Sequence, residues 1–416
     1  MANELLLALD LGTTTLAGRL FSADGELCAE ATLFNPQGEF GADVLRRMEA
    51  SLAGDAAALQ LALQDGIDEL VTVLLNQCHA SRAHIVRAAG AGNPAISCLL
   101  QGLPVESLLY PPHRPPSYSS VYLQLDCLPV PLFLFPLVSG YVGGDLVAVL
   151  YGFEPCGDKT FFVDVGTNGE MALYAAGQWW VTSVAAGPAF EGGNIACGMV
   201  ASVGAVTGVV LEDDRIVLEV RGGGLPRGLC GSGLTEAISV MLEAGLIDTG
   251  GTIVDVDDVA TNLSRYIGHN DQGRTICMYR DAKTRLELTQ DDIRQFQLAK
   301  GAVYAGAECL LARAGITSDE LAAAVVTGAL GFSIGRNILS AVGMLPEKLI
   351  EKVTFYDGGV IAGLSRCLLN AHGADVDAEV QALTDSLRPY PLSGTPHFEK
   401  AFVAAINFPN RVNDAD

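Results

Sequence analysis

The feature that most constrains the fold of this chain is a short unit that occurs twice, far apart in the sequence. The first copy spans residues 6–15 (LLALDLGTTT) and the second spans residues 161–170 (FFVDVGTNGE). In each copy an apolar run typical of a β-strand ends at an aspartate, turns through glycine and threonine, and leads into a second apolar run. Glycine lets backbone N–H groups approach a phosphate, threonine adds hydroxyl donors, and aspartate can hold a hydrated divalent cation. One copy would be a common hairpin turn, but two copies predict two related half-domains that face each other across a nucleotide cleft.

Size and charge narrow the class of protein. The chain has 416 residues, half of them hydrophobic and 18% charged, which is enough apolar material for two lobes that each have a core. A net charge of −23 argues against nucleic acid and anionic membrane surfaces as partners, and we interpret it as a solubility feature. The start of the chain lacks the basic region of a signal peptide. The most hydrophobic window, 127–138, is short and interrupted by prolines, so we expect no membrane span.

The cysteines are numerous but scattered. The chain has ten, each standing alone and none in a C-x-x-C pair. Ligation of zinc or an iron–sulfur cluster by one chain usually requires clustered cysteines. Some lie within apolar stretches, as Cys309 and Cys367 do, where a thiol behaves as a small core residue. We therefore predict reduced structural cysteines, no iron–sulfur cluster and a cytoplasmic location.

Strands and helices alternate along the chain, which predicts an α/β fold. We predict an amphipathic helix from about residue 55 to residue 79, and a long helix through Arg313 that begins at the N-cap pair Thr289 and Asp292. Gly301 and Gly306 within the long helix lower its helix propensity, so we expect close helix packing there.

We expect a first lobe at residues 1–152 and a second at 153–416, with the helix 357–371 crossing back to the first lobe. Glycine turns follow two predicted strands of the second half, at 327–331 and at 357–359. A glycine turn between a strand and a helix is a common contact point for an anion or a nucleotide, although each one alone could be an ordinary tight turn.

The order of these motifs resembles the ATPase superfamily of actin, heat-shock chaperones and sugar kinases. More narrowly, the chain resembles the reductive activators of corrinoid-dependent proteins. The similar segments are 35–37, 41–44, 140–145, 164–170, 186–192, 230–234, 288–300 and 405–409. The similarity extends over essentially the whole chain, and its most specific motifs are 164–170 and 186–192. It implies two related lobes of the actin-like (ribonuclease-H-like) fold with a central nucleotide cleft.

The chemistry that this resemblance implies is phosphoryl transfer from ATP to water, which depends on positioning and charge neutralisation. It places Mg²⁺ near Asp10 and Asp164, mostly through waters. It assigns catalysis to Asp164 and to Asp145, which would orient the attacking water; the alternative role of Asp145 is a helix N-cap. Glu170 and Glu191 stay open between a supporting role at the site and a structural salt bridge. The residues implied to contact ATP or ADP are Asp10, Gly12, Thr13, Thr14, Thr15, Gly166, Thr167, Asn168, Gly169, Gly328 and Gly331.

Two departures from the family pattern affect what the resemblance implies. Members of the family usually carry an N-terminal two-iron ferredoxin domain, whereas here the ATPase part begins at residue 5. We therefore expect a separate ferredoxin to supply electrons to any redox reaction. The family's Gly-Gly-Phe-Gly adenosine loop reads GALG at residues 328–331, so a methyl group stands where the backbone approaches the nucleotide.

Three functions remain open from the sequence. The first is a Mg²⁺-dependent ATPase of the reductive-activase type, which couples hydrolysis to activation of a corrinoid or other redox protein. The second is a non-enzymatic nucleotide-binding regulator or scaffold, in which the altered adenosine loop marks lost turnover. The third is a small-molecule kinase, because a fold does not fix a function. The identity of the partner, the rate of hydrolysis and the formation of a homodimer are also left open.

Overall fold

The computed structural model describes residues 4–153, 156–271, 273–328, 334–370, 375–392 and 394–410. The chain divides into two compact units that each combine segments distant in sequence. The first unit consists of Met1–Asp158, Tyr174–Thr182 and Gly358–Tyr390, and the second of Lys159–Leu173, Ser183–Asp357 and Pro391–Asp416. The predicted lobe boundary at residue 152 and the crossing of helix 357–371 stay predictions.

A six-stranded sheet with the order β3-β2-β1-β4-β6-β5 forms the centre of the first unit. Its strands are β1 (Leu5–Leu11), β2 (Thr15–Ser22), β3 (Leu27–Phe34), β4 (Ile85–Gly92), β5 (Val121–Leu123) and β6 (Leu132–Leu134). Its helices are α1 (Val44–Ala50), α2 (Ala56–Gln77), α3 (Pro94–Gln101), α4 (Glu106–Leu109), α5 (Gly144–Gly152), α10 (Gly359–Asn370) and α11 (Asp375–Ser386). Strand β1 pairs antiparallel with β2 and parallel with β4, and it is almost wholly buried, as expected of a central strand.

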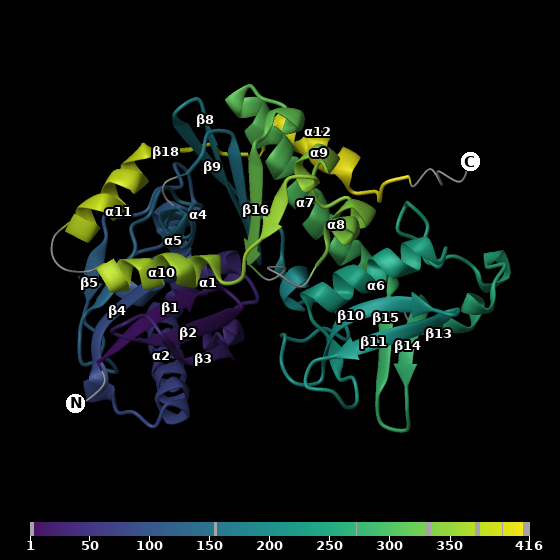
Figure 1. The fold of residues 1–416 in the computed structure, drawn as a ribbon, viewed down its shortest axis with the longest axis horizontal. Helices are drawn as coiled ribbons and strands as arrows, with labels where there is room; N and C mark the ends of the chain where they lie inside the picture. Colours follow the sequence, from purple (N-terminus) through teal and green to yellow (C-terminus); the bar gives the residue numbers. More distant parts are fainter. Residues whose placement is uncertain are drawn as a thin grey trace. The chain divides into compact units, whose positions relative to one another are not determined.

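Helices cover both faces of this sheet. Helix α2 packs on β2 and β3, whereas α5 and α10 pack on the side of β1 and β4 (Figure 1). The apolar side chains of α2 recur with a helical period at Leu59, Leu63, Ile67, Leu70 and Leu74, and all five are fully buried. This spacing gives α2 the single apolar stripe that a sheet-covering helix needs. The helix predicted from residue 55 to residue 79 is confirmed as α2, two residues shorter at its C-terminal end.

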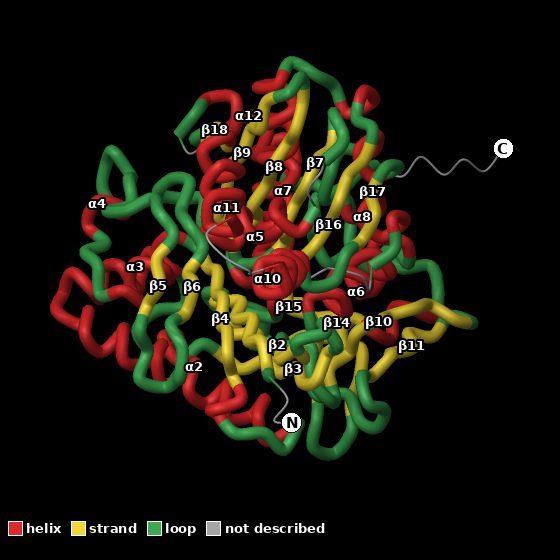
Figure 2. Tube along the Cα trace, turned by 60° about the vertical axis from the view of Figure 1, so that its left-hand side comes forward, coloured by secondary structure: helices red, strands yellow, loops and turns green. Residues whose placement is uncertain are grey.

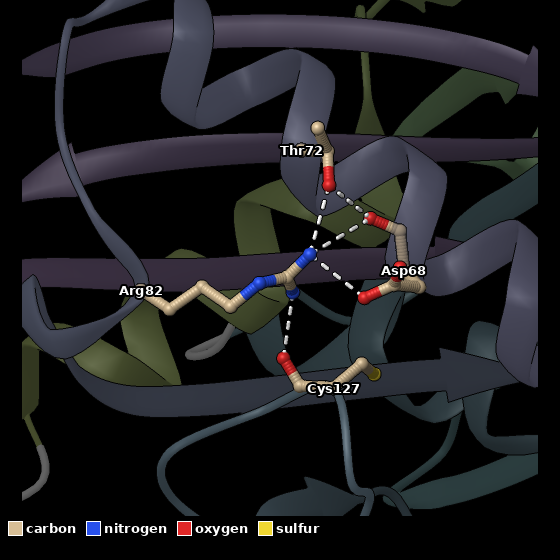
Figure 3. A network of polar contacts seen from close by, with 4 residues as sticks. All are labelled: Asp68, Thr72, Arg82 and Cys127. Atoms are coloured by element: carbon tan, nitrogen blue, oxygen red, sulfur yellow. Dashed lines mark hydrogen bonds and ion pairs between the residues drawn. The ribbon is translucent and has the colours of Figure 1, made fainter.

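A polar network attaches the C-terminal half of α2 to the chain that follows it (Figure 3). The Arg82 guanidinium donates to the Cys127 carbonyl at 2.7 Å and to the Thr72 hydroxyl at 2.8 Å. It also forms an ion pair with Asp68 at 2.7 Å. The Asp68 and Arg82 side chains are 52% and 36% exposed, so the ion pair adds little stability by itself. The network instead fixes the position of the segment before β6 relative to the helix.

The second unit contains all or part of three further sheets. The strands of these sheets, apart from β18, are β7 (Thr160–Val165), β8 (Asn168–Ala175), β9 (Gln178–Ala185), β10 (Ala205–Glu212), β11 (Arg215–Val220), β12 (Gly228–Leu229), β13 (Ile267–Asn270), β14 (Gly273–Arg280), β15 (Arg285–Thr289), β16 (Ala323–Gly328) and β17 (Val353–Phe355). The helices of the second unit are α6 (Gly231–Glu243), α7 (Gln290–Ala314), α8 (Arg336–Val342), α9 (Glu347–Ile350) and α12 (Pro396–Ala405). The six-stranded sheet has the order β17-β16-β7-β8-β9-β18, where β18 is Leu387–Pro389, and the division into units passes through β8 and β9. Figure 2 shows β17, β16, β7 and β8 side by side.

Helix α7 organises the packing of the second unit. The predicted cap pair is confirmed, because the Thr289 hydroxyl accepts from the Asp292 amide and the Asp292 carboxylate accepts from the Thr289 amide. The predicted close packing at Gly306 is confirmed as well, since an added Cβ would lie 2.9 Å from the side chains of Met171 and Val184. The small residues of α7 therefore let this helix approach the strands β8 and β9 closely.

A buried lysine on α7 holds the C-terminal segment of the described chain. Lys300 is 1% exposed, and its ammonium donates to the Asn407 carbonyl at 2.5 Å. The same ammonium lies 5.2 Å from the centre of the Phe408 ring, within range of a cation–π interaction. Burial lowers the pKa of Lys300 to about 8 from its ordinary value of 10.5, because removal from water disfavours the charged form.

This lysine gives a testable pH dependence of stability. Between pH 8 and pH 10.5 the unfolded chain retains a proton that the folded chain has lost, so Lys300 makes the free energy of unfolding rise with pH. The rise is at most about 1.4 kcal/mol per pH unit. We expect Lys300→Met to remove this increment, measured by urea unfolding at a series of pH values. Lys400→Met, on the exposed face of α12, is the matched control and should keep the wild-type slope. Equal slopes in wild type and Lys300→Met would contradict the pKa shift.

Candidate functional site

The first predicted phosphate-contacting loop follows β1 in the first unit. Asp10 is the next-to-last residue of β1 and is half-buried, opposite Ala17 of β2 and Ala91 of β4. A Cβ on Gly12 would lie 2.6 Å from the Thr15 carbonyl oxygen, so the turn accepts only glycine at this position. The sequence order strand, aspartate, glycine and threonine therefore produces the tight turn that the motif predicts.

Two buried asparagines, which the sequence analysis did not assign to the site, brace this loop. The Asn35 side chain donates to the Gly12 carbonyl at 2.9 Å, and the Asn35 amide donates to the Thr14 carbonyl at 2.9 Å. The Asn93 side chain donates to the Thr13 hydroxyl at 2.9 Å. Each asparagine is also the N-cap of a helix that begins with proline. The Asn-Pro pairs in the sequence signal these caps, but only the fold brings them to the loop.

Asp145 lies in the first turn of α5, close to the same loop. The N-cap of α5 is Gly143, so the alternative interpretation of Asp145 as the helix N-cap is wrong. The Asp145 carboxylate accepts from the Leu146 amide at 3.0 Å. A Cβ on Gly143 would lie 2.5 Å from the Asn93 Cα and 2.6 Å from an Asp145 carboxylate oxygen. The first unit thus brings Asp145 beside Asn93, which itself holds Thr13, although these residues are far apart in sequence.

In the second unit, Asp164 and Gly328 lie together. Asp164 is the next-to-last residue of β7, is half-buried, and is in register with Thr327 of the parallel strand β16. The backbone of Gly328 has a φ of +88°, which favours glycine, and an added Cβ would overlap an Asp164 carboxylate oxygen. Two predicted site residues from segments far apart in sequence are therefore adjacent. Gly331, the other predicted glycine of this loop, lies outside the described residues, as do Ala329 and Leu330.

The turn after β7 is closed by a carboxylate from the 186–192 motif. The Thr167 amide donates to one oxygen of Glu191 at 2.8 Å, and the Thr167 hydroxyl donates to the other at 3.0 Å. The Gly166 amide donates to the Asn168 carbonyl at 3.0 Å, which makes the turn tight. Glu191 therefore contacts this turn directly through hydrogen bonds, which the sequence did not reveal.

Gly169 and Glu170 lie beyond this turn, in β8. An added Cβ on Gly169 would lie 2.8 Å from a methyl of Val184 and 3.3 Å from a methyl of Val303, so packing alone accounts for a glycine here. Glu170 is 4% exposed, next to Gly169 in the interior of the unit. The roles predicted for the remaining site residues in binding and catalysis stay predictions.

The side chains of the two loops suit a hydrated Mg²⁺ and a nucleotide phosphate. Their carboxylates and hydroxyls are hard oxygen ligands, which Mg²⁺ prefers. Their glycine N–H groups can approach a phosphate closely because glycine has no side chain. Within residues that the structure describes, no group of three or more His, Cys, Asp or Glu lies close enough to hold a metal ion. The ten cysteines are free thiols, and burial raises the pKa of Cys98, Cys197 and Cys367 to about 12. No helix of the described chain is both long and apolar enough to cross a membrane.

Comparison with protein families gives two adjoining matches. Residues 158–415 match a family model described as the C-terminal domain of RACo, the ASKHA domain. Residues 5–154 match a model described as the RACo middle region. Together the two matches extend over nearly the whole chain.

Curated relatives and a solved structure agree with these matches. The chain is 28% identical over 98% of its length to the corrinoid activation enzyme RamQ of Eubacterium limosum. It is 23% identical over 87% of its length to the [Co(II) methylated amine-specific corrinoid protein] reductase of Methanosarcina barkeri. A solved structure of a reductive activator for a corrinoid, iron–sulfur protein superposes on 98% of the chain with a TM-score of 0.90 at 26% identity. The chain spans 70% and 69% of the two relatives and 66% of the solved chain. The predicted actin-like ATPase fold is confirmed.

Proposed function

The chain belongs to the RACo family, as its resemblance to reductive activators of corrinoid proteins predicted, and on that premise we propose that it is a Mg²⁺-dependent ATPase that activates a corrinoid protein. The observation that carries the proposal is the superposition of 98% of the chain on a reductive activator with a TM-score of 0.90. The names of both curated relatives, a corrinoid activation enzyme and a corrinoid protein reductase, support the same class of partner.

In the proposed reaction, the chain positions the phosphates of ATP, and a bound Mg²⁺ would neutralise their charge. Asp10 and Asp164 are the residues that would hold this hydrated cation. Thr13, Thr14 and Thr15 donate to phosphate oxygens from the first loop, and Thr167 and Asn168 donate from the second. Gly12, Gly166, Gly169, Gly328 and Gly331 complete the proposed set of nucleotide contacts. Asp145 accepts a proton from the attacking water and orients it for in-line attack.

The proposed redox step uses a separate electron donor. Reduction of a Co(II) corrinoid to Co(I) consumes one electron, which we assign to a separate low-potential ferredoxin. ATP hydrolysis by this chain would supply the free energy by changing its affinity for the corrinoid protein between nucleotide states. The binding of ATP or ADP, the Mg²⁺ ion, the cytoplasmic location and a homodimer belong to the same proposal.

Nucleotide binding is the first experimental test. We expect calorimetric titration with ATP and Mg²⁺ to give 1:1 binding, and we expect Asp164→Ala and Thr14→Ala each to weaken it at least tenfold, about 1.4 kcal/mol. Asp281→Ala is the matched control, because this half-buried carboxylate lies outside the predicted loops and accepts from the Lys283 and Thr284 amides and the Tyr279 hydroxyl at the turn between β14 and β15. No binding heat and no thermal shift with any adenine nucleotide would overturn the proposal.

Partner activation is the second part of the test. The chain is mixed with a Co(II) corrinoid protein, a reduced ferredoxin and ATP, and the Co(I) absorbance is followed anaerobically. We expect Co(I) to accumulate only when the chain and ATP are both present. Nucleotide binding without turnover or Co(I) formation would favour the regulator alternative, and transfer of phosphate to a small molecule would favour the kinase alternative.

A further inference from the structure

A carboxylate of the chain occupies donors that an anionic ligand would use. The Thr167 backbone amide and hydroxyl converge on the two oxygens of Glu191, at 2.8 and 3.0 Å. A backbone N–H beside a hydroxyl forms a general site for oxyanions, whether carboxylate or phosphate. Thr167 is buried, at 6% exposed, and both of these donors contact Glu191.

The segment that carries Glu191 is attached to the same turn by its backbone. Glu191 ends the short 3₁₀-helix Pro188–Glu191, which Gly187 and Gly192 flank with φ values of 82° and 81°. The Gly187 amide donates to the Thr167 carbonyl at 2.9 Å. A Cβ on Gly166 would lie 2.9 Å from a Glu191 oxygen, so the carboxylate lies against the bare backbone of the turn. The glycines on both sides of the 3₁₀-helix have the conformational freedom to let it move.

The Thr167 donors that contact Glu191 are also among the proposed nucleotide contacts. The following inference therefore rests on the proposed function. We propose that Glu191 is a specificity-determining residue that holds the Thr167 donors in the nucleotide-free chain and yields them to a nucleotide phosphate. A single N–H cannot make two well-aligned hydrogen bonds, and a carboxylate left beside a phosphate repels it. A polyphosphate must therefore displace Glu191, whereas a nucleoside without phosphate leaves it in place.

Substitution by glutamine tests this competition. Glu191→Gln removes the negative charge and keeps the size of the side chain, so it weakens the hold on Thr167. We expect it to tighten the binding of ATP with Mg²⁺, and of inorganic tripolyphosphate, by roughly tenfold, and to leave adenosine binding unchanged. Thermal unfolding of each variant verifies that it folds.

Glu320→Gln is the matched control. Glu320 accepts from the Thr317 amide at 2.9 Å and from the Thr317 hydroxyl at 3.3 Å, and it ends another 3₁₀-helix of the same unit. It therefore makes a similar contact with a threonine outside the predicted loops, through one carboxylate oxygen, while the other forms an ion pair with Lys159 at 3.3 Å. We expect Glu320→Gln to bind ATP, tripolyphosphate and adenosine as the wild type does.

Hydrogen exchange gives a readout that does not depend on turnover. In the wild type, saturating ATP should increase exchange in the segment 187–192, because Glu191 is released, while the Thr167 amide stays protected by phosphate. Equal or weaker ATP and tripolyphosphate binding by Glu191→Gln, or unchanged exchange in 187–192, would overturn the inference while leaving the proposed function intact. Failure of wild type and variant alike to bind ATP would overturn the proposed function, and the inference with it.

Discussion

Asp145→Asn is expected to leave ATP binding nearly unchanged and to slow ATP hydrolysis about a hundredfold, the low end of the contribution of a positioned general base. Asp145 lies in the first turn of α5, near the backbone of Asn93, whose side chain donates to Thr13. Asparagine preserves the size and the hydrogen-bonding oxygen of this side chain but cannot accept a proton from water. The measurement is steady-state phosphate release, with calorimetry to separate binding from turnover, both with and without a corrinoid partner.

Asp43→Asn is the control for this variant. Asp43 is the N-cap of α1 in the same unit and accepts from the Arg46 amide at 2.9 Å, a function that asparagine performs equally well. Binding and hydrolysis should both stay at wild-type values. Unchanged hydrolysis in Asp145→Asn would remove this residue from the catalytic proposal and favour the regulator alternative. Weakened binding with normal turnover would instead assign Asp145 to nucleotide positioning.

The sequence predicted those features that depend on neighbouring residues. The turn around Gly12 follows from local sterics, and so does the cap of α7 by Thr289 and Asp292. The α/β fold and the family were predicted because the order of such local motifs is itself distinctive. Strand ends that carry aspartate and glycine were therefore recognisable before the structure was known.

Other features of the candidate site depend on contacts between segments distant in sequence. In the sequence, Asn35 and Asn93 are recognisable only as residues that precede prolines, because nothing local indicates that they reach Gly12 and Thr13. The hydrogen bonds between Glu191 and Thr167 could not be predicted for the same reason. The alternative role for Asp145 was wrong because a helix boundary is uncertain by one or two residues, and here the N-cap falls on Gly143.

The packing of α5 against α10 through glycines could likewise not be predicted from the sequence. A glycine within a helix lowers helix propensity, and its benefit is visible only once the neighbouring helix is in place. Gly363 of α10 lies against the backbone of Ala148 in α5, and a Cβ on Gly152 would lie 3.0 Å from the Gly363 amide nitrogen. Both helices therefore approach at glycines, which lets their backbones come into direct contact.

We expect Gly363→Ala to lower the free energy of unfolding by about 3 kcal/mol, the upper end of the usual cost of overpacking. The added methyl would overlap the Ala148 carbonyl, and backbone cannot move aside as a flexible side chain can. Gly38→Ala, in the same unit, is the control, because no atom lies within 4 Å of its added Cβ. Urea unfolding measures both variants, and equal stability would contradict the packing argument. Since Asp145 lies at the start of α5, a shift of this helix should also slow ATP hydrolysis in Gly363→Ala, whereas Gly38→Ala should leave it unchanged.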